Sequence, residues 1–348
     1  MKKIAFTGGG SAGHVVPNLS LISEILASGE ADVCYFGSDG IEKSLVERLK
    51  IPYYQTQCPK LVRGKSFSAW KRNLKIPCLL KKAVRHAEKG LREFAPDVVF
   101  SKGGYVSLPV VLAARRLKIP CLTHESDFSI GLANKIMAKK CERVLTSFPE
   151  TADKFKNGKY TGAPVRWELF GYSKAEGEQK FLGTHGKKVV LVFGGGSGSA
   201  AINEALRNAL PALTKNYFIL HICGKGNRVE SNLKNYRQEE FVADMGAAYA
   251  VADLVIARAG AGTVFEILAL KKPAILVPLE GQTRGDQKEN AKYFEKKGLC
   301  RVLKQSELAR LPEEIDDCFA DESLKQRLAV SNFVCGNSNI LHEIRKFL

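Results

Sequence analysis

A turn of three glycines and a serine occurs twice in this chain, each time directly after a short apolar run. Residues 4–7 lead into GGGS at 8–11, and residues 189–193 lead into GGGS at 194–197. A strand that ends in glycines and continues into helical periodicity is typical of a parallel, doubly wound α/β sheet, which binds ligands at the carboxyl ends of its strands. The repeated turn therefore predicts two Rossmann-like domains that face each other across a cleft.

Further apolar runs alternate with helical periodicity in both halves of the chain. The other predicted strands are residues 33–37, 97–101, 121–125, 144–147, 218–223, 253–257 and 274–277. Residues 162–166 (GAPVR) and a polar stretch at 171–188 interrupt the alternation. A chain of 348 residues is long enough for two cores. We place the domains at 1–162 and 163–336, and we interpret residues 337–348 as a helix that packs back on the first domain.

Charge and cysteine content bear on partners and compartment. The 53 Lys and Arg against 36 Asp and Glu give a formal net charge of +17, which favours contact with nucleic acid, a phosphate-rich ligand or acidic lipid. The nine cysteines occur without a C-x-x-C pair, so we predict neither a disulfide framework nor a zinc cluster, and a reducing compartment. The apolar runs are too short for a signal peptide or a transmembrane helix, so we expect any membrane contact to be peripheral.

Basic and apolar side chains are interleaved along residues 60–92. The basic ones are Lys60, Arg63, Lys65, Lys71, Arg72, Lys75, Lys81, Lys82, Arg85, Lys89 and Arg92, and the apolar ones include Phe67, Trp70, Leu74, Ile76, Leu79 and Leu80. This mixture suits an anionic bilayer surface. The alternative is a solvated helix whose apolar stripe belongs to the core. We do not expect nucleic-acid binding, because aromatic residues are few and no recognised motif accompanies the charge.

The first glycine turn satisfies G-x-G-x-x-G at Gly8, Gly10 and Gly13. Such a turn lets backbone N–H groups approach a phosphate at a helix N-terminus. An NAD site, with Asp39 as the ribose acceptor, fits the same motif. His14 follows the last glycine, where it suits either chemistry beside a phosphate or sugar, or simple hydrogen bonding at the helix start.

A second glycine-containing helix start lies at residues 258–266 (RAGAGTVFE), after a predicted strand. Its amides can hold a pyrophosphate, and Glu266 can then accept hydrogen bonds from both ribose hydroxyls. An ordinary capped helix with a solvated Glu266 is the alternative. Residues 278–290 read as a long polar loop, in which Gln287 and Asn290 could contact sugar hydroxyls or form a surface turn.

Two polar segments follow neighbouring predicted strands of the first domain, at residues 102–107 and 124–127. We expect both at the same edge of the sheet. Transfer to a sugar hydroxyl requires a proton acceptor, and the candidates are His14, His124, Glu125 and Asp127. No metal site is predicted, because the histidines are isolated and no Asp-x-Asp pair occurs. Helix dipoles and Arg166 would then meet the charge of a diphosphate.

Six segments occur in one order along almost the whole chain: GGGSAGHVVPNLSL, SKGGYVSLPVVLAA, THESD followed by GLANK, TGAPVR, VLVFGGGSGSAAIN and ARAGAGTVFEI. Together they resemble the MurG family, which belongs to glycosyltransferase family 28 and has the GT-B fold. The resemblance implies inverting transfer of N-acetylglucosamine from UDP-N-acetylglucosamine to the muramoyl 4-hydroxyl of undecaprenyl-diphosphate-linked muramoyl-pentapeptide (lipid I to lipid II) in peptidoglycan synthesis. It implies no cofactor, and a peripheral position on the cytoplasmic face of the cell membrane.

The resemblance also implies roles for residues on the donor side. Arg166 and Ser197 would contact the diphosphate, Val242 the uracil through its backbone, Glu266 the ribose and Gln287 the N-acetylglucosamine hydroxyls. The other implied donor contacts are Ser11, Ala12, Gly13, Gly262 and Thr263. On the acceptor side it implies Tyr105 and Asn134, and it places His14 near the reacting centre. From the residues themselves we add His124 on the acceptor side, and we name His14, Asp127 and Glu125 as the catalytic candidates.

This chain departs from the family pattern at two places. Many relatives have Thr-Gly where Ser11-Ala12 stands, and Asn where Asp127 stands. The extra acid makes Asp127 a stronger candidate for the base, and the base is left open. The first alternative function is transfer of a sugar to diacylglycerol by a related transferase with the same fold. The second glycine turn and residues 258–266 argue against an NAD-dependent oxidoreductase and against a non-enzymatic basic binding protein.

Overall fold

The computed structural model describes the backbone of residues 1–348 except 62–66, 182–185, 282–284 and 334, and it leaves the side chains at 67–69 and 72 undescribed. The chain forms two compact units, one of Met1–Val165 with Cys335–Leu348 and the other of Arg166–Val334. These limits lie a few residues from the domain boundaries predicted from the sequence. Val165 belongs to unit 1 because it is 3% exposed and bonded to two residues of that unit. Its N–H donates to Asn337 Oδ1 at 2.9 Å, and its carbonyl accepts from Ser20 Oγ at 3.1 Å.

Unit 1 contains a seven-stranded sheet in the order β3-β2-β1-β4-β5-β6-β7, and every pairing is parallel. The strands are β1 Lys2–Thr7, β2 Ala31–Gly37, β3 Tyr53–Gln55, β4 Val98–Ser101, β5 Cys121–Glu125, β6 Arg143–Thr146 and β7 Gly158–Tyr160. The helices are α1 Ala12–Ser28, α2 Ile41–Glu47, α3 Phe67–Leu74, α4 Ile76–Phe94, α5 Ser107–Arg116, α6 Leu132–Ala138, α7 Pro149–Ala152 and α15 Asn337–Arg345.

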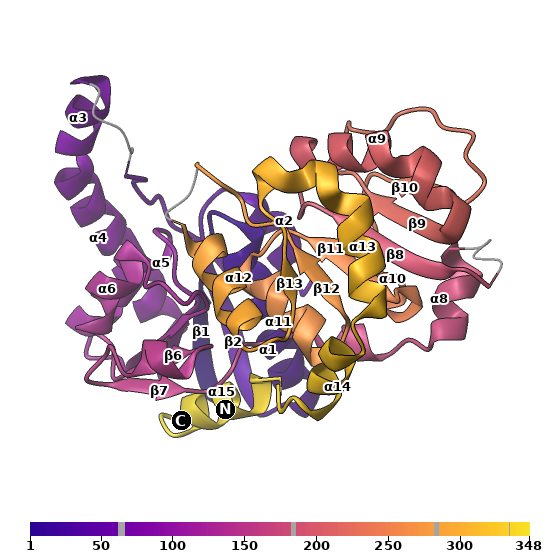
Figure 1. The fold of residues 1–348 in the computed structure, drawn as a ribbon. Helices are drawn as coiled ribbons and strands as arrows, with labels where there is room; N and C mark the ends of the chain where they lie inside the picture. Colours follow the sequence, from indigo (N-terminus) through magenta and orange to yellow (C-terminus); the bar gives the residue numbers. More distant parts are fainter. Residues whose placement is uncertain (62–66, 182–185, 282–284, 334) are drawn as a thin grey trace. The chain divides into compact units, whose positions relative to one another are not determined.

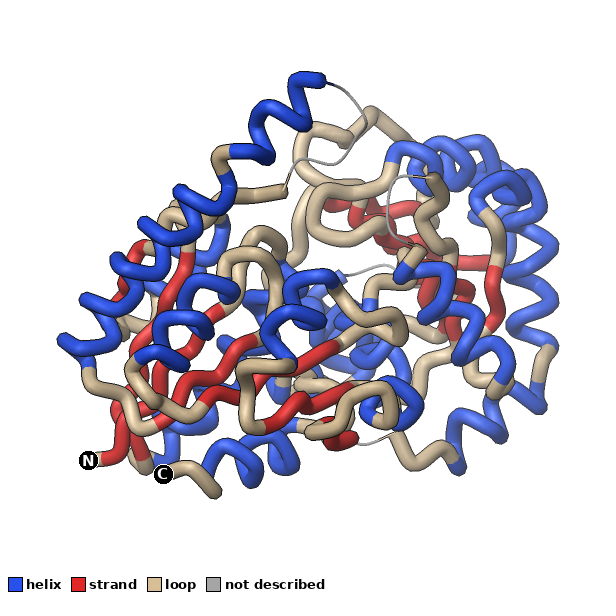
Figure 2. The backbone as a smooth tube through the Cα atoms, turned by 90° about the vertical axis from the view of Figure 1, so that its left-hand side faces the viewer, coloured by secondary structure: helices blue, strands red, loops and turns tan. Residues whose placement is uncertain are grey.

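Helices cover both faces of this sheet (Figure 2). Alternate residues of β1 point to opposite faces, so Ile4 and Phe6 belong to one apolar cluster and Ala5 to the other. The terminal helix α15 contributes Ile340 and Ile344 to the first cluster. Both chain ends therefore lie at the same end of unit 1 (Figure 1).

Helix α4 packs on unit 1 along only part of its length. Its buried residues are Ala83, Val84, Ala87, Gly90, Leu91 and Phe94, all toward its C-terminal end. Its N-terminal end continues beyond the sheet with α3 at the tip (Figure 1), and there Trp70, Leu74 and Leu79 are 59%, 57% and 48% exposed. Within the described residues, no helix combines the length and apolarity needed to cross a bilayer.

Unit 2 contains a six-stranded parallel sheet in the order β10-β9-β8-β11-β12-β13. The strands are β8 Lys188–Phe193, β9 Tyr217–Ile222, β10 Tyr236–Glu239, β11 Leu254–Ala257, β12 Ala274–Leu276 and β13 Arg301–Val302. The helices are α8 Lys174–Phe181, α9 Ala200–Asn216, α10 Met245–Val251, α11 Ala261–Ala269, α12 Asp286–Lys296, α13 Leu311–Ala320 and α14 Glu322–Val330, with 3-10 helices η1 Trp167–Phe170 and η2 Gln305–Arg310.

The prediction of two parallel α/β units is confirmed, and every predicted strand is present within a residue or two of its limits. One loop interpretation is wrong: the predicted polar loop at 278–290 ends where α12 begins at Asp286. The polar stretch at 171–188, for which no helix was predicted, contains α8. Both helices are rich in charged residues, so their sequences lack the apolar periodicity that marks a core-facing helix.

Each sheet changes the direction of its strand order at one place. In unit 1 the change falls between β1 and β4, and in unit 2 between β8 and β11. Loops leaving the two strands at such a switch point diverge to opposite faces and open a crevice at the carboxyl edge. The segments after β1, β4, β8 and β11 include both glycine turns and most of the predicted site residues.

Candidate functional site

In unit 1 the glycine turn after β1 lies against the loop after β4. A Cβ added to Gly10 would approach Tyr105 Cε1 to 2.5 Å, and one added to Gly104 would approach the Gly9 carbonyl oxygen to 2.9 Å. Both Gly10 and Gly104 have positive φ, 81° and 83°. The two loops therefore interlock through glycines that no larger residue could replace without displacement.

His14 lies in the first turn of α1, and a backbone carbonyl orients its ring. Its Nδ1 is 3.2 Å from the carbonyl oxygen of Lys102. A carbonyl can only accept, so Nδ1 carries the hydrogen, and in the neutral ring Nε2 carries the lone pair. Gly104 allows the loop to come close, because a Cβ there would lie 3.0 Å from His14 Cδ2. The arrangement presents Nε2 as a proton acceptor.

Glu125 and Asn134 form a buried hydrogen-bond network that holds the loop after β5. Glu125 is 4% exposed; its Oε1 accepts from the Asp127 N–H at 3.1 Å and its Oε2 from the Gly131 N–H at 2.8 Å. The Asn134 amide donates to the same Oε2 at 2.9 Å and to the His124 carbonyl at 3.3 Å. Both Glu125 oxygens thus hold the loop in shape.

His124 is fully buried, and its partners determine its tautomer. Its Nε2 lies 3.0 Å from the Gly162 carbonyl, so Nε2 carries the hydrogen and Nδ1 accepts from Lys102 Nζ at 3.1 Å. Burial, followed by the nearby Lys102 charge, holds the pKa of His124 well below its ordinary value. The ring is therefore neutral at physiological pH.

His14, Tyr105 and Asp127 are the predicted catalytic and acceptor residues of this edge that remain partly exposed. The Lys60 ammonium lies 5.8 Å from the centre of the Tyr105 ring, and burial raises the pKa of the Tyr105 hydroxyl. Ser11, Ala12 and Gly13 are exposed at the start of α1. Unit 1 thus brings together the predicted catalytic and acceptor residues with these three predicted donor contacts.

In unit 2 the second glycine turn leads into α9. Ser199 is the N-cap residue of that helix, and its hydroxyl accepts from the Ile202 N–H at 3.4 Å. Ser197, two residues earlier, is exposed. Gly198 is required by packing, because a Cβ there would collide with the Cys223 carbonyl oxygen. The turn therefore leaves the Ser197 side chain accessible beside the switch point.

Arg258 holds the two switch-point loops of unit 2 in place, a role that the sequence did not reveal. It is 8% exposed; its Nη2 donates to Ser199 Oγ and to Gln305 Oε1, both at 2.7 Å. Its Nη1 donates to the carbonyls of Val277 and Pro278 at 3.2 and 3.3 Å. In the sequence, only the position of Arg258 directly after a predicted strand indicated that its side chain could contact the loops at the carboxyl edge of the sheet.

Glu266 lies in α11 with a partner on each carboxylate oxygen. Arg166 Nε donates to Oε1 at 2.9 Å, and the buried Tyr249 hydroxyl donates to Oε2 at 3.3 Å. Burial lowers the pKa of Arg166, but the Glu266 charge more than offsets this and the pKa is raised. The solvated Glu266 of the alternative interpretation is wrong, because the structure holds this carboxylate in one orientation.

The other predicted donor residues lie around the same sheet edge of unit 2. Gly262 and Thr263 occupy the first turn of α11, whose N-cap residue Gly260 offers no side chain to satisfy the free N–H groups. Val242 is 8% exposed in the loop after β10. Gln287 lies in the first turn of α12, where its Oε1 accepts from the Leu279 N–H at 2.9 Å.

Asn290, the second amide of the predicted polar loop, is not at the surface. It is fully buried in α12, and its Nδ2 donates to the Ala259 carbonyl at 3.3 Å. This bond ties α12 to the loop before α11. The interpretation of Asn290 as a sugar contact in an exposed loop is therefore wrong, because the helix turns its side chain inward.

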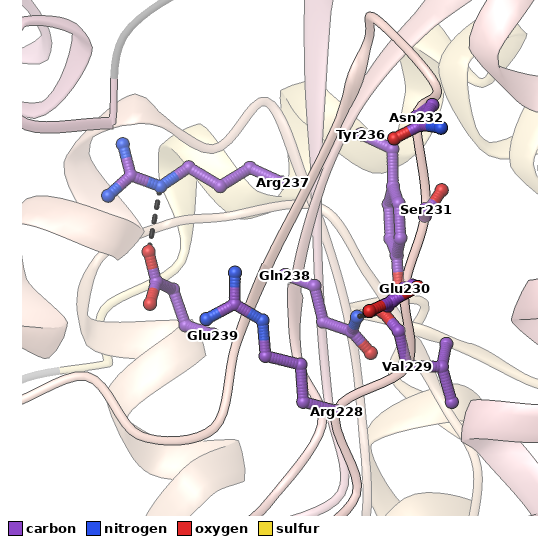
Figure 3. Close-up of a pocket in the computed structure, with 9 residues that line it drawn as sticks. All are labelled: Arg228, Val229, Glu230, Ser231, Asn232, Tyr236, Arg237, Gln238 and Glu239. Carbon is purple, nitrogen blue, oxygen red and sulfur yellow. Dashed lines mark hydrogen bonds and ion pairs between the residues drawn. The ribbon is translucent and has the colours of Figure 1, made fainter.

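A polar pocket of about 1170 Å³ lies elsewhere in unit 2, between residues 228–232 and β10. Figure 3 shows Arg237 paired with Glu239 on one side of the strand and Tyr236 on the other. None of the residues predicted for the site lines this pocket. Among the described residues, no group of three His, Cys, Asp or Glu side chains is arranged to hold a metal ion.

Two parallel-sheet units, each with a glycine turn at its switch point, form the GT-B architecture of the glycosyltransferase structures that this chain matches. The crystal structure of Acinetobacter baumannii MurG matches with a TM-score of 0.76 and 25% identity, covering 99% of this chain and 100% of that one. Residues 4–146 match the glycosyltransferase family 28 N-terminal domain, and residues 189–338 match the C-terminal domain. The chain therefore belongs to glycosyltransferase family 28.

Curated relatives in this family are similar over most of their length. A protein of Clostridium perfringens (strain SM101 / Type A) is 42% identical over 99% of this chain and 98% of its own. Its name is UDP-N-acetylglucosamine--N-acetylmuramyl-(pentapeptide) pyrophosphoryl-undecaprenol N-acetylglucosamine transferase. A Bacillus cereus (strain ATCC 14579) protein with the same name, numbered 2, is 45% identical over 88% of each chain.

Proposed function

We propose that this chain transfers N-acetylglucosamine from UDP-N-acetylglucosamine to the muramoyl group of undecaprenyl-diphosphate-linked muramoyl-pentapeptide, converting lipid I to lipid II in peptidoglycan synthesis. The observation that carries the proposal is 42% identity over almost the full length of the Clostridium perfringens transferase of that name. The family resemblance of the six motifs points to the same reaction. Residues at the switch points of the two units have the chemistry that such a transfer needs, namely groups that can bind a nucleotide diphosphate and a group that can accept a proton.

The donor residues of the proposal lie mainly in unit 2. A carboxylate has about four lone-pair positions, so Glu266 can keep Arg166 and Tyr249 and still accept from both ribose hydroxyls. The N–H groups of Gly262 and Thr263, at the positive end of α11, suit the diphosphate. Arg166 has further N–H donors beyond the Nε used on Glu266, and these suit the diphosphate as well.

On the acceptor side, His14 is the base that we favour. The muramoyl 4-hydroxyl attacks the anomeric carbon from the face opposite UDP, its proton passes to His14 Nε2, and the bond to the UDP oxygen breaks. Amides at the start of α11 stabilise the charge that develops on the leaving diphosphate. Glu125 and Asn134 position the loop after β5, and Asp127 and Tyr105 contact the acceptor. The resulting linkage is β(1→4).

The test is transfer of labelled sugar to detergent-solubilised muramoyl-pentapeptide diphosphoryl-polyprenol, with UDP-glucose and UDP-galactose as donor controls. Product from UDP-N-acetylglucosamine alone supports the proposal. A diacylglycerol acceptor is included in parallel. Activity on diacylglycerol without activity on the muramoyl lipid would reject the proposed acceptor and favour the glycolipid alternative.

The membrane contact in this proposal is made by α3 and the N-terminal end of α4. Trp70, Leu74 and Leu79 are exposed there among Lys71, Lys75, Lys81 and Lys82, all exposed as well. Apolar side chains enter the headgroup region while lysines meet anionic lipid. The predicted Arg63 and Lys65 lie outside the described residues, and the Arg72 side chain is not described. We place the enzyme peripherally on the cytoplasmic face of the membrane, where the acceptor lipid is exposed.

Replacing Lys71 and Lys75 together by serine is expected to weaken binding to anionic vesicles by about 30-fold at low salt, since each lysine near such a surface contributes about 1 kcal/mol. Co-sedimentation with phosphatidylglycerol vesicles measures this. Lys225 and Lys234, exposed in unit 2, give a control pair that removes the same net charge. Equal losses for both pairs would mean that binding follows total charge and that α3 and α4 are not the contact.

A further inference from the structure

His221 is a fully buried titratable side chain of unit 2 for which the sequence predicted no role. It lies on β9, the neighbour of β8 in the sheet, and shares a face with Cys223, because alternate residues of a strand point the same way. Both of its ring nitrogens have partners. Nε2 is 3.0 Å from Asn203 Oδ1, and Nδ1 is 2.9 Å from the Tyr236 hydroxyl. The ring therefore joins α9 to β10 through the interior.

Asn203 links His221 to the loop after β9. It is 2% exposed on α9, and its Nδ2 donates to the Cys223 carbonyl at 2.8 Å. Since this bond commits the amide nitrogen, Oδ1 accepts the His221 Nε2 hydrogen, and Nδ1 accepts from the Tyr236 hydroxyl. Burial, and after it the charge of Arg207, lowers the pKa of His221 to about 4, which keeps the ring neutral. His221 thus fixes the direction in which the Asn203 amide faces.

The Cys223 carbonyl is packed against the second glycine turn. A Cβ added to Gly198 would collide with that oxygen, and one added to Gly224 would approach the Ser197 carbonyl oxygen to 2.6 Å. Both glycines have positive φ, 76° and 89°, so the two loops interlock at positions that favour glycine. A displacement of the Cys223 carbonyl would therefore displace the turn that carries Ser197.

We propose that His221 is a positioning residue for the donor diphosphate: by orienting Asn203 it holds the loop after β9 against the second glycine turn, and so fixes Ser197. The inference deepens the proposed function, on which it rests for the assignment of Ser197 to the diphosphate. Arg258 secures the helix end of the same turn through the Ser199 hydroxyl. The pair of His221 and Asn203 secures its middle.

Asparagine and glutamine at position 221 form a matched pair of neutral amides, each of which keeps the contact of one ring nitrogen. Glutamine reaches about as far as Nε2 and can donate to Asn203, whereas asparagine ends near the position of Nδ1, toward the Tyr236 hydroxyl. His221→Asn should lower the ratio of UDP to uridine affinity by about fivefold, the value of one ordinary hydrogen bond, and His221→Gln should keep it within about twofold of wild type.

Calorimetric titration of UDP and of uridine measures this ratio. The proposed uridine contacts, Val242 and Glu266, belong to other segments, so affinity for uridine itself should hold in both variants. A role of His221 in stability alone would affect the two ligands alike. Equal ratios in His221→Asn and His221→Gln would overturn the proposal.

The second measurement uses the protein without ligand. Within the turn the Gly198 N–H donates to the Gly195 carbonyl at 3.0 Å, so hydrogen exchange of peptides across residues 194–199 reports how firmly the turn is held. Exchange should be about fivefold faster in His221→Asn and unchanged in His221→Gln. Tyr236→Phe is the control, because it removes a buried hydroxyl without touching Asn203. Equal acceleration in Tyr236→Phe and His221→Asn would mean that exchange follows stability alone, which would reject the proposal.

Asn203→Ala breaks the next link and covers the case in which His221→Asn does not fold. It should lower the ratio of UDP to uridine affinity as His221→Asn does, and a wild-type ratio in folded Asn203→Ala would overturn the proposal. Wild-type protein that binds UDP no better than uridine would instead reject the diphosphate role of Ser197, and with it the donor site of the proposed function. The exchange measurement would then still accept or reject the link from His221 to the turn.

Discussion

Replacing His14 by alanine is expected to lower kcat by about 10²- to 10⁴-fold, the usual contribution of a positioned general base. The Lys102 carbonyl keeps the hydrogen on Nδ1, so the variant loses the one ring nitrogen that can take the proton of the attacking hydroxyl. Affinity for UDP should change little, because most of the proposed donor contacts belong to unit 2. Steady-state turnover and calorimetric titration of UDP measure the two effects.

His342 provides a matched control for this substitution. It is exposed on α15, far along the chain from any residue of the proposed site, and His342→Ala should retain wild-type turnover. A fall of kcat in His14→Ala no larger than that in His342→Ala would mean that another group accepts the proton. Asp127 would then be the next candidate, since the structure commits both oxygens of Glu125 to the loop.

Replacing Glu266 by alanine is expected to have the opposite pattern, with UDP binding about 100-fold weaker and kcat at saturating donor changed much less. Two hydrogen bonds from ribose to a charged acceptor are worth about 1.5–3 kcal/mol each, and part of this is recovered by water. The sharper measurement is the ratio of affinities for UDP and 2′-deoxy-UDP. Wild type should prefer UDP, and the variant should lose that preference.

Two further variants separate ribose recognition from general damage. Tyr249→Phe removes only the hydroxyl that orients Glu266 Oε2, so it should reduce the same preference by about fivefold, the value of one ordinary hydrogen bond. Glu204→Ala, at an exposed position of α9, should leave it unchanged. If Glu266→Ala weakens UDP and 2′-deoxy-UDP equally, the carboxylate does not contact the 2′-hydroxyl.

The central strands of both sheets could be predicted from the sequence, and the outer strands could not. Strands β3, β7, β10 and β13 are absent from the sequence prediction, and they are the four edge strands of the two sheets. A central parallel strand is buried on both faces and reads as a continuous apolar run. An edge strand such as β10, Tyr236–Glu239, is partly exposed and carries Arg237, so its local sequence resembles a loop.

The sequence was sufficient to predict which segments form the site, but not which residues hydrogen-bond to one another within it. His14 and Glu266 stand in motifs that mark the ends of strands, and the sequence was sufficient to name them. The ring orientation of His14 depends on the Lys102 carbonyl, 88 residues away in the chain. The orientation of Glu266 depends on Arg166, 100 residues earlier. Such pairings bring distant segments together, and residue spacing alone carries no signal for them.

The sequence by itself determined two parallel α/β units, the glycine turns at their switch points and the family. These properties follow from local patterns, namely apolar runs, glycines and motif order, which each segment displays without reference to the rest. Only the tertiary structure decided that Arg258 donates hydrogen bonds to the loops of unit 2, that Asn290 points inward and that the buried Lys102 donates to His124 and Ser126. Burial makes these polar groups take specific partners, and the partners are chosen by packing between segments far apart in the chain.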